Sequence, residues 1–119
     1  MDYRKEYERW LSSESLLPDE REELLAIAES DEEIRDRFTS ALSFGTAGLR
    51  AEMKLGIGGM NRFTVAETTR GIAALIKAKG GEARGVAIAY DSRNNSELYA
   101  RVSASILASL GMRRIYSIP

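Results

Sequence analysis

The clearest indication of the fold class is the stretch VAIAYDSRNN, residues 86–95. Its first half, Val86–Tyr90, is a short continuous apolar run, which predicts a β-strand buried on both faces. Polar residues follow at the strand end and lead into a helix expected over Ser96–Leu110. Apolar residues within 115–118 then indicate a last strand, so this region predicts strand, helix and strand in that order.

The preceding region adds strands and a helix to this alternation. We interpret residues 42–53 as a strand with a glycine-rich irregularity and Met60–Thr64 as a short return strand. Thr64 to Glu67 form a capping box, which predicts a helix from Thr64 to about Lys79. Strands that alternate with helices indicate an α/β fold, and we expect a layered sheet flanked by helices.

Apolar side chains at helical spacing predict which helix faces point into the core. In the first of these two helices the inward residues are expected to be Ile72, Leu75 and Ile76. In the second helix they are expected to be Leu98, Tyr99, Val102, Ile106 and Leu107. Three methionines, Met53, Met60 and Met112, are expected to fill gaps in the core.

The first forty residues predict three short helices, near 2–13, 18–29 and 31–40. Pro18 is tolerated in a first helical turn, and Ser30 with Glu33 forms a capping box before the third helix. Their apolar stripes are expected to serve packing. We therefore divide the chain into an N-terminal helical extension, residues 1–40, and an α/β domain, residues 41–119.

The charge is distributed unevenly although the net charge is only −1. Residues 1–40 hold 13 acidic and 6 basic side chains, whereas residues 41–119 hold 5 acidic and 11 basic ones. A basic half can raise the local concentration of anionic ligands through its summed field. The alternative is that two solvated surfaces of opposite sign attract each other.

Composition excludes several classes of chemistry. The chain has 119 residues, which fits one domain of about 100–200 residues. It contains no cysteine, which excludes disulfide and thiolate chemistry, and no histidine, the most common general base and metal ligand. No run of 18 apolar residues and no apolar leader segment is present. We expect a cytoplasmic protein without nucleic-acid or membrane partners.

Two segments are candidates for binding phosphate. Residues 91–95 follow the predicted strand at its carboxyl end, where open α/β sheets bind ligands, and they precede a helix N-terminus. Ser92 could donate a hydroxyl hydrogen bond and Arg93 could bind phosphate oxygens bidentately. The alternative is helix capping, which by itself selects Asp, Ser and Asn at these positions.

The second candidate is the stretch FGTAGLR, residues 44–50. Two glycines within a strand mark a bulge or a close backbone approach, Thr46 places a hydroxyl there, and Arg50 ends the stretch. The alternative is a bulged strand with a surface arginine. The glycines at 56, 58 and 59 lack the lysine and hydroxyl ending of a nucleotide-binding P-loop, so we do not expect them to bind a nucleotide.

Three stretches in order resemble the α-D-phosphohexomutase superfamily of phosphoglucomutases and phosphomannomutases, in the branch that includes phosphopentomutase-like members. They are FGTAGLR at 44–50, MNRFTV at 60–65 and AYDSR at 89–93. The resemblance runs over essentially the whole chain and is most specific over 42–119. It implies the first α/β domain of a sugar-phosphate mutase.

The resemblance also implies a chemistry. Such enzymes interconvert hexose or pentose 1-phosphate and 6- or 5-phosphate through a phosphoserine, with Mg²⁺ neutralising charge. Arg50 would support the phosphoserine, and Thr46, Ser92 and Arg93 would lie near the phosphate or the substrate. The Ser-His-Asn-Pro segment and the aspartate-rich metal loop of the family have no counterpart here. Ala51 replaces a common glycine, and Gly59 replaces an arginine frequent in this branch.

We therefore expect an N-terminal piece of an isomerase of the phosphotransferase type, inactive alone and binding no metal itself. Its partners would be a sugar phosphate and the remaining domains of the same chain. Apolar surface left uncovered by those domains predicts self-association. Two alternatives remain: a stand-alone module that binds anions without catalysis, and a protein-interaction domain that uses the acidic helices.

Overall fold

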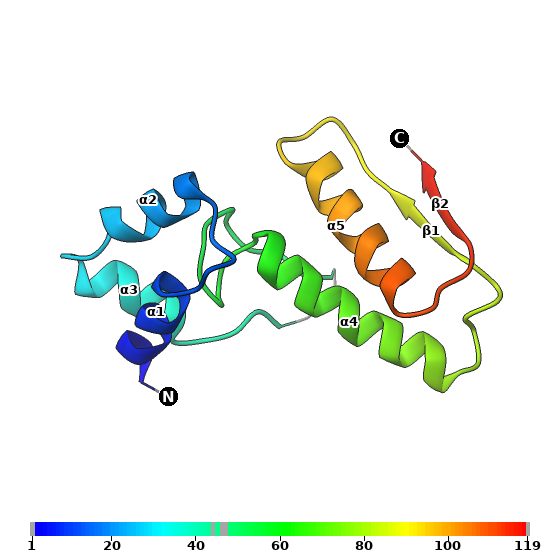
Figure 1. The fold of residues 1–119 in the computed structure, drawn as a ribbon, viewed down its shortest axis with the longest axis horizontal. Coiled ribbons are helices and arrows are strands. Elements are labelled where there is room, and N and C mark those ends of the chain that lie inside the picture. The colour runs from blue at the N-terminus through cyan, green and yellow to red at the C-terminus, as the bar shows by residue number, and fades with distance from the viewer. Residues whose placement is uncertain (1, 44, 46–47, 119) are drawn as a thin grey trace. The chain divides into compact units, whose positions relative to one another are not determined.

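A computed structural model describes residues 2–43, 45 and 48–118 (Figure 1). The elements follow one another as α1 (Tyr3–Leu11), α2 (Pro18–Ala26), α3 (Asp31–Phe38), α4 (Arg62–Ala78), β1 (Val86–Ala89), α5 (Ser96–Ser109) and β2 (Ile115–Ile118). The chain divides into two compact units, Met1–Asn61 and Arg62–Pro119, and each is described by itself.

The three helices predicted in the first unit are confirmed, and local signals explain their starts. The Asp2 carboxylate accepts hydrogen bonds from the backbone N–H groups of Arg4 and Lys5 at the start of α1. Pro18 occupies the first turn of α2. Ser30 accepts a hydrogen bond from the Glu33 N–H at 3.3 Å, which is half of the predicted capping box. The Glu33 side chain is instead engaged by Arg37.

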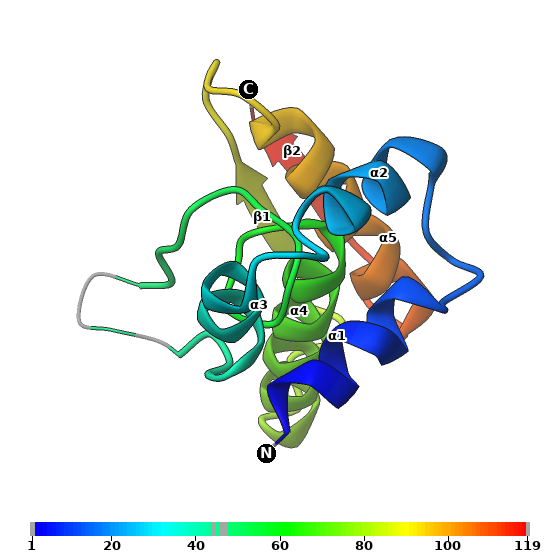
Figure 2. The ribbon, with the colours of Figure 1, turned by 90° about the vertical axis from the view of Figure 1, so that its left-hand side faces the viewer.

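The helices of the first unit share one apolar core. α1 packs against both α2 and α3 (Figure 2). Tyr7, Leu24, Ile34 and Phe38 are buried, and the Phe38 ring meets Tyr7 and Trp10 edge-on at centroid distances of 5.7 Å. The Tyr7 hydroxyl donates to the Leu24 carbonyl oxygen at 2.7 Å, which satisfies a buried polar group.

The strand expected over 42–53 is wrong for the residues that the structure describes. Phe44, Thr46 and Ala47 lie outside the described residues, and the others form only isolated bridges, Gly45 with Gly48 and Met53 with Met60. The return strand at Met60–Thr64 is wrong as well, because α4 already begins at Arg62. The predicted capping box at Thr64 therefore lies inside a helix.

The glycine-rich loop that follows this stretch is held by hydrogen bonds from one side chain, that of Asn61. The Asn61 side-chain amide donates to the carbonyl oxygens of Lys54 at 2.9 Å and Gly56 at 3.0 Å. It also reaches the Gly59 carbonyl oxygen at 3.4 Å. These bonds satisfy backbone groups that a sheet ladder would otherwise pair. Periodicity in the sequence does not report such a side-chain contact.

The second unit contains a strand–helix–strand arrangement with parallel strands. β1 pairs with β2 from Val86 opposite Ile115 to Ala89 opposite Ile118, and α5 is the connection between them. Both strands and both helices were predicted, with bounds that differ by one or two residues. The α/β character is confirmed in this coarse form, whereas a sheet with further strands stays a prediction.

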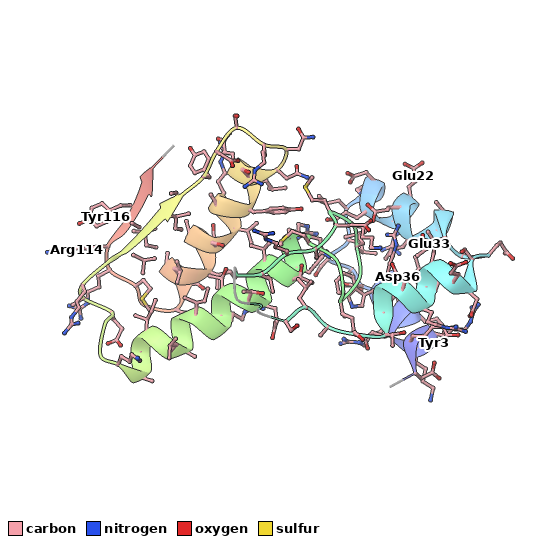
Figure 3. The ribbon with its side chains drawn as sticks, turned by 180° about the vertical axis from the view of Figure 1, so that it is seen from behind. Tyr3, Glu22, Glu33, Asp36, Arg114 and Tyr116 are labelled. Carbon is pink, nitrogen blue, oxygen red and sulfur yellow. The ribbon has the colours of Figure 1, made fainter. Side chains whose placement is uncertain are left out.

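The core of the second unit lies between the two helices and one face of the sheet. Ala73, Leu107 and Met112 are buried, and partly buried residues pack around them: Ile76, Val86, Ile88, Leu110 and Ile115. The other face of β1 exposes Ala87 and Ala89, so burial on both faces is wrong for this strand. Tyr116 of β2 is 54% exposed and projects away from α5 (Figure 3).

The inward faces of the two helices differ partly from those predicted. Ile72, Leu75 and Leu98 are exposed, and so is Met53 in the first unit. α4 instead turns Thr69 and Ala73 inward, and the Thr69 and Ser103 hydroxyls lie 2.9 Å apart where α4 meets α5. Small residues allow the two helices to approach closely, and hydropathy does not select such a face.

Replacing Gly59 by alanine should destabilise the first unit. A Cβ at Gly59 would overlap the Lys54 carbonyl oxygen, which is a backbone atom that cannot move aside easily. We expect a loss of about 1–3 kcal/mol in the free energy of unfolding, measured by urea titration. Gly71→Ala is the matched control, because open space surrounds Gly71 in α4 and the change should stabilise by about 0.5–1 kcal/mol. An unchanged Gly59→Ala midpoint would contradict the tight packing of the loop.

Candidate functional site

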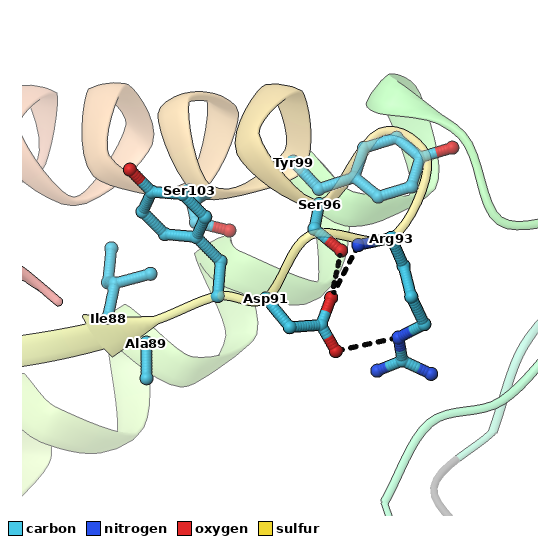
Figure 4. Close-up of a pocket in the computed structure, with 9 residues that line it drawn as sticks. Ile88, Ala89, Asp91, Arg93, Ser96, Tyr99 and Ser103 are labelled. Carbon is cyan, nitrogen blue, oxygen red and sulfur yellow. Dashed lines mark hydrogen bonds and ion pairs between the residues drawn. The ribbon is translucent and has the colours of Figure 1, made fainter. Parts of the chain in front are cut away.

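The candidate site is the loop between β1 and α5, at the carboxyl end of β1. Figure 4 shows this loop and the hollow beside it. The hollow measures about 550 Å³ and is lined by residues of β1, the loop and the first turns of α5. A second hollow of about 640 Å³ lies along residues 90–95, Glu97 and Leu98. Both have Arg93 in their walls, so the loop offers a cation to a bound ligand.

Asp91 orders this loop through three hydrogen bonds. Its carboxylate accepts from the backbone N–H of Arg93 at 3.0 Å and from the Ser96 hydroxyl at 2.9 Å. It also accepts from Nε of Arg93 at 2.7 Å. The bond from the Arg93 backbone contributes most to a pKa of Asp91 below the ordinary value, and the Ser96 hydroxyl and the Arg93 guanidinium add to it. Asp91 therefore orders the loop before α5 without capping the helix, because the N-cap residue of α5 is Asn95, with no side-chain cap hydrogen bond.

Arg93 and Ser92 have the features that the binding interpretation requires. The Arg93 side chain is 85% exposed, and Asp91 engages its Nε while neither Nη atom bonds to a described residue. A guanidinium held at one nitrogen retains donors for two phosphate oxygens. Ser92 is exposed, and its hydroxyl makes no hydrogen bond within the described part of the chain. The start of α5 next to them carries the positive end of a helix dipole.

Arg50, the other predicted site residue, belongs to the first unit. Its side chain is exposed and makes no hydrogen bond or ion pair with any residue described in the structure. Thr46 lies outside the described residues. The structure thus brings Asp91, Ser92 and Arg93 together in one loop, and it places Arg50 in the other unit.

Three polar residues of α5 line the first hollow and were not singled out from the sequence as site residues: Ser96, Tyr99 and Ser103. They recur at helical spacing, i, i+3 and i+7, so they share the face of α5 that looks onto the end of β1. In the sequence, two hydroxyls and a phenol at this helical spacing follow the polar residues that end the strand. That pattern could have indicated these three residues as site residues.

The described residues do not fit a magnesium site. Within 2–43, 45 and 48–118 there is no group of three or more His, Cys, Asp or Glu side chains that could hold a metal ion. The carboxylate of the candidate loop, Asp91, already binds Arg93 and Ser96. We therefore derive no chemical step through a metal. Among the described helices, none is long and apolar enough to cross a membrane.

The chain belongs to the phosphoglucomutase/phosphomannomutase family. Residues 41–117 match the model of its first domain, described as phosphoglucomutase/phosphomannomutase, alpha/beta/alpha domain I. The matched range contains Arg50, Ser92 and Arg93. The resemblance drawn from the three stretches of sequence is thereby confirmed.

Individual relatives support the same family. The chain is 38% identical over 81 residues to proteins named phosphoglucomutase from Staphylococcus aureus strains USA300, NCTC 8325 / PS 47 and COL. The aligned part is 68% of this chain and 14% of the length of each relative. No solved structure matches the chain.

The stability of the candidate loop should depend on pH through Asp91. Because the folded pKa lies below the unfolded value of about 3.9, Asp91 stabilises the folded state above pH 3.9, and this contribution is lost as the pH falls through the folded pKa. We expect the Asp91 carboxyl carbon to titrate at lower pH than an unfolded aspartate in an NMR titration. Asp91→Asn should remove that part of the pH dependence of unfolding, whereas Glu29→Gln, an exposed control, should not. A titration at the unfolded value would contradict the three hydrogen bonds.

Proposed function

We propose that this chain is the N-terminal domain portion of a sugar-phosphate mutase. The reaction would interconvert hexose or pentose 1-phosphate and 6- or 5-phosphate by phosphoryl transfer through a serine in a later segment. The observation that carries the proposal is a loop within the family-matched range in which Asp91 orders Arg93 at the carboxyl end of β1. The proposal includes magnesium bound by other parts of the protein and a cytoplasmic location.

The described residues would contribute binding and charge. Phosphoryl transfer depends mainly on positioning and on stabilising the negative charge of the transferred group. Arg93 would donate its Nη hydrogens to phosphate oxygens, and Ser92 would add a hydroxyl donor beside them. Arg50 would stabilise charge near the phosphoserine, as the resemblance implies. All three side chains are exposed, so a ligand can reach them.

Replacing Arg50 in a longer protein that contains the remaining domains should lower turnover. We expect Arg50→Ala to reduce kcat by at least about tenfold, which corresponds to roughly 1.4 kcal/mol of lost transition-state stabilisation. The measurement is conversion of glucose 1-phosphate, followed by a coupled assay. Arg70→Ala is the matched control, since Arg70 is an exposed helical arginine paired with Glu67.

The 119-residue chain by itself should show no conversion, and activity of the purified chain would contradict its proposed dependence on later domains.

A stand-alone anion-binding module is the second candidate, and the exposed Arg93 favours it as much as the mutase. Titration of the chain with glucose 1-phosphate distinguishes it from an interaction domain, because only an anion-binding module shifts the amide resonances of residues 91–95. Sequencing the gene beyond codon 119 distinguishes both from a mutase. A reading frame that encodes a serine within Ser-His-Asn-Pro would support the mutase.

We also propose that the chain self-associates through exposed apolar residues of the second unit. Ile72 and Leu75 lie three residues apart on α4 and are both exposed, with Leu75 at 58%. Sedimentation equilibrium should show a mass that rises with concentration, and Leu75→Gln should reduce the rise. Leu25→Gln, at an exposed leucine of the first unit, is the control. A monomer throughout the concentration range would contradict the proposal.

A further inference from the structure

We infer that the ion pair between Arg37 and Glu23 is a positioning element for Arg50. It fixes the loop of residues 52–61, called the anchor loop below, and Arg50 lies two residues before that loop. The role of Arg50 towards phosphate rests on the proposed function, whereas the anchoring does not. Arg37 and Glu23 lie before residue 41, outside the range that matches the family's first domain.

The Arg37 side of the ion pair is largely enclosed, the Glu23 side chain is 41% exposed, and both reach the anchor loop directly. The Arg37 side chain is 12% exposed, and its Nη1 donates to Oε2 of Glu23 at 2.8 Å. The same Glu23 oxygen accepts the Leu55 backbone N–H at 2.7 Å, and Nη1 of Arg37 also reaches the Leu55 carbonyl oxygen at 3.4 Å. Both backbone polar groups of Leu55 are therefore bound by the pair. Nε of Arg37 donates to Glu33 at 3.1 Å, so two carboxylates balance the guanidinium.

Backbone contacts bring the anchor loop against α3 at the same place. The Gly58 N–H donates to the Arg37 carbonyl oxygen at 3.0 Å. Gly56 adopts φ +119°, and a Cβ there would lie 2.7 Å from that carbonyl oxygen, so a glycine is required for this approach. Lys54 adds an ion pair to Asp36 of α3 at 2.6 Å. Lys54 and Gly58 thus bind the loop to α3, and Gly56 passes close to the Arg37 carbonyl oxygen between them.

Arg50 lies between Leu42, which bonds to the anchor loop eight residues earlier, and Glu52, where the loop begins two residues later. On one side, the Leu42 N–H donates to the Ile57 carbonyl oxygen at 3.2 Å. On the other, the anchor loop itself begins at Glu52, whose carbonyl oxygen accepts the Met60 N–H at 2.8 Å. Two residues span at most about 7 Å, so the Cα atom of Arg50 lies within that distance of Glu52. A shift of the anchor loop therefore moves Arg50.

The other arginine of α3, Arg35, forms a salt bridge that does not reach the anchor loop, and so it serves as a comparison. Arg35 lies two residues before Arg37, is 64% exposed and pairs with Asp31 at 3.3 Å without any hydrogen bond to the anchor loop. Exposed pairs of this kind contribute little to stability. Arg37 differs because its planar guanidinium donates hydrogen bonds to Glu23, Glu33 and Leu55 at once. The ammonium group of a lysine does not reproduce this geometry.

The test compares Arg37→Lys with Arg35→Lys in the 119-residue chain by NMR. In Arg37→Lys we expect hydrogen exchange at the Leu55 and Gly58 amides to accelerate by about tenfold, since the bonds that protect them weaken. The amide resonance of Arg50 should move in the same variant. Arg35→Lys keeps the charge and changes an exposed pair, so it should leave all three amides unchanged. Glu23→Gln is a second variant, which removes the charge of the ion pair and retains an oxygen acceptor for the Leu55 N–H. If circular dichroism shows that Arg37→Lys is unfolded, the same amides are measured in Glu23→Gln, with the same expected changes.

The outcomes separate the inference from the proposed function. Unchanged exchange at Leu55 and Gly58, or an Arg50 resonance that stays in place, overturns the positioning role whatever the enzymology. If both change while Arg50→Ala keeps full turnover in the longer protein, the proposed function of Arg50 fails and the anchoring stands. If both change and Arg37→Lys lowers kcat of the longer protein without raising KM, the ion pair positions Arg50 for turnover.

Discussion

The first unit depends on one guanidinium, that of Arg37. Beyond Phe38 the chain forms a loop with few buried side chains, among which Leu55 is apolar and 3% exposed. Ionic and backbone hydrogen bonds from α2 and α3 also order the loop. The desolvation of a mostly enclosed guanidinium is offset because two carboxylates and a carbonyl oxygen surround it. The N-terminal helices are thus connected physically to the part of the chain that matches the family.

The second unit orders its loop by a similar device. Asp91 binds the backbone and the side chain of Arg93 and the hydroxyl of Ser96, so one carboxylate shapes the whole turn into α5. In both units an acidic side chain holds a backbone N–H and an arginine together. Where Arg37 is enclosed and structural, Arg93 is exposed and retains free donors, which suits it to bind an anion.

Local signals predicted most elements, and non-local contacts explain the errors. The helices α1 to α3 and the order β1, α5, β2 followed from capping residues, periodicity and apolar runs. The strand predicted over 42–53 is wrong, and the described residues there form only isolated bridges, while Asn61 and Arg37 bind the backbone of the loop that follows. Ile72 and Leu75 were assigned inward by hydropathy, yet Ala73 faces the core because its small side chain permits close helix packing.

Three ordered stretches of sequence indicated the family through their resemblance to its members, and capping residues and apolar runs indicated the α/β order of the second unit. It also indicated Ser92, Arg93 and Arg50 as candidate residues. The fold shows that Asp91 orders its loop while Arg93 stays available, and that Glu23 and Arg37 hold the anchor loop. The sequence does not distinguish an exposed carboxylate or guanidinium from an enclosed one. Folding sets the burial and the neighbours of each group, and these decide what the group does.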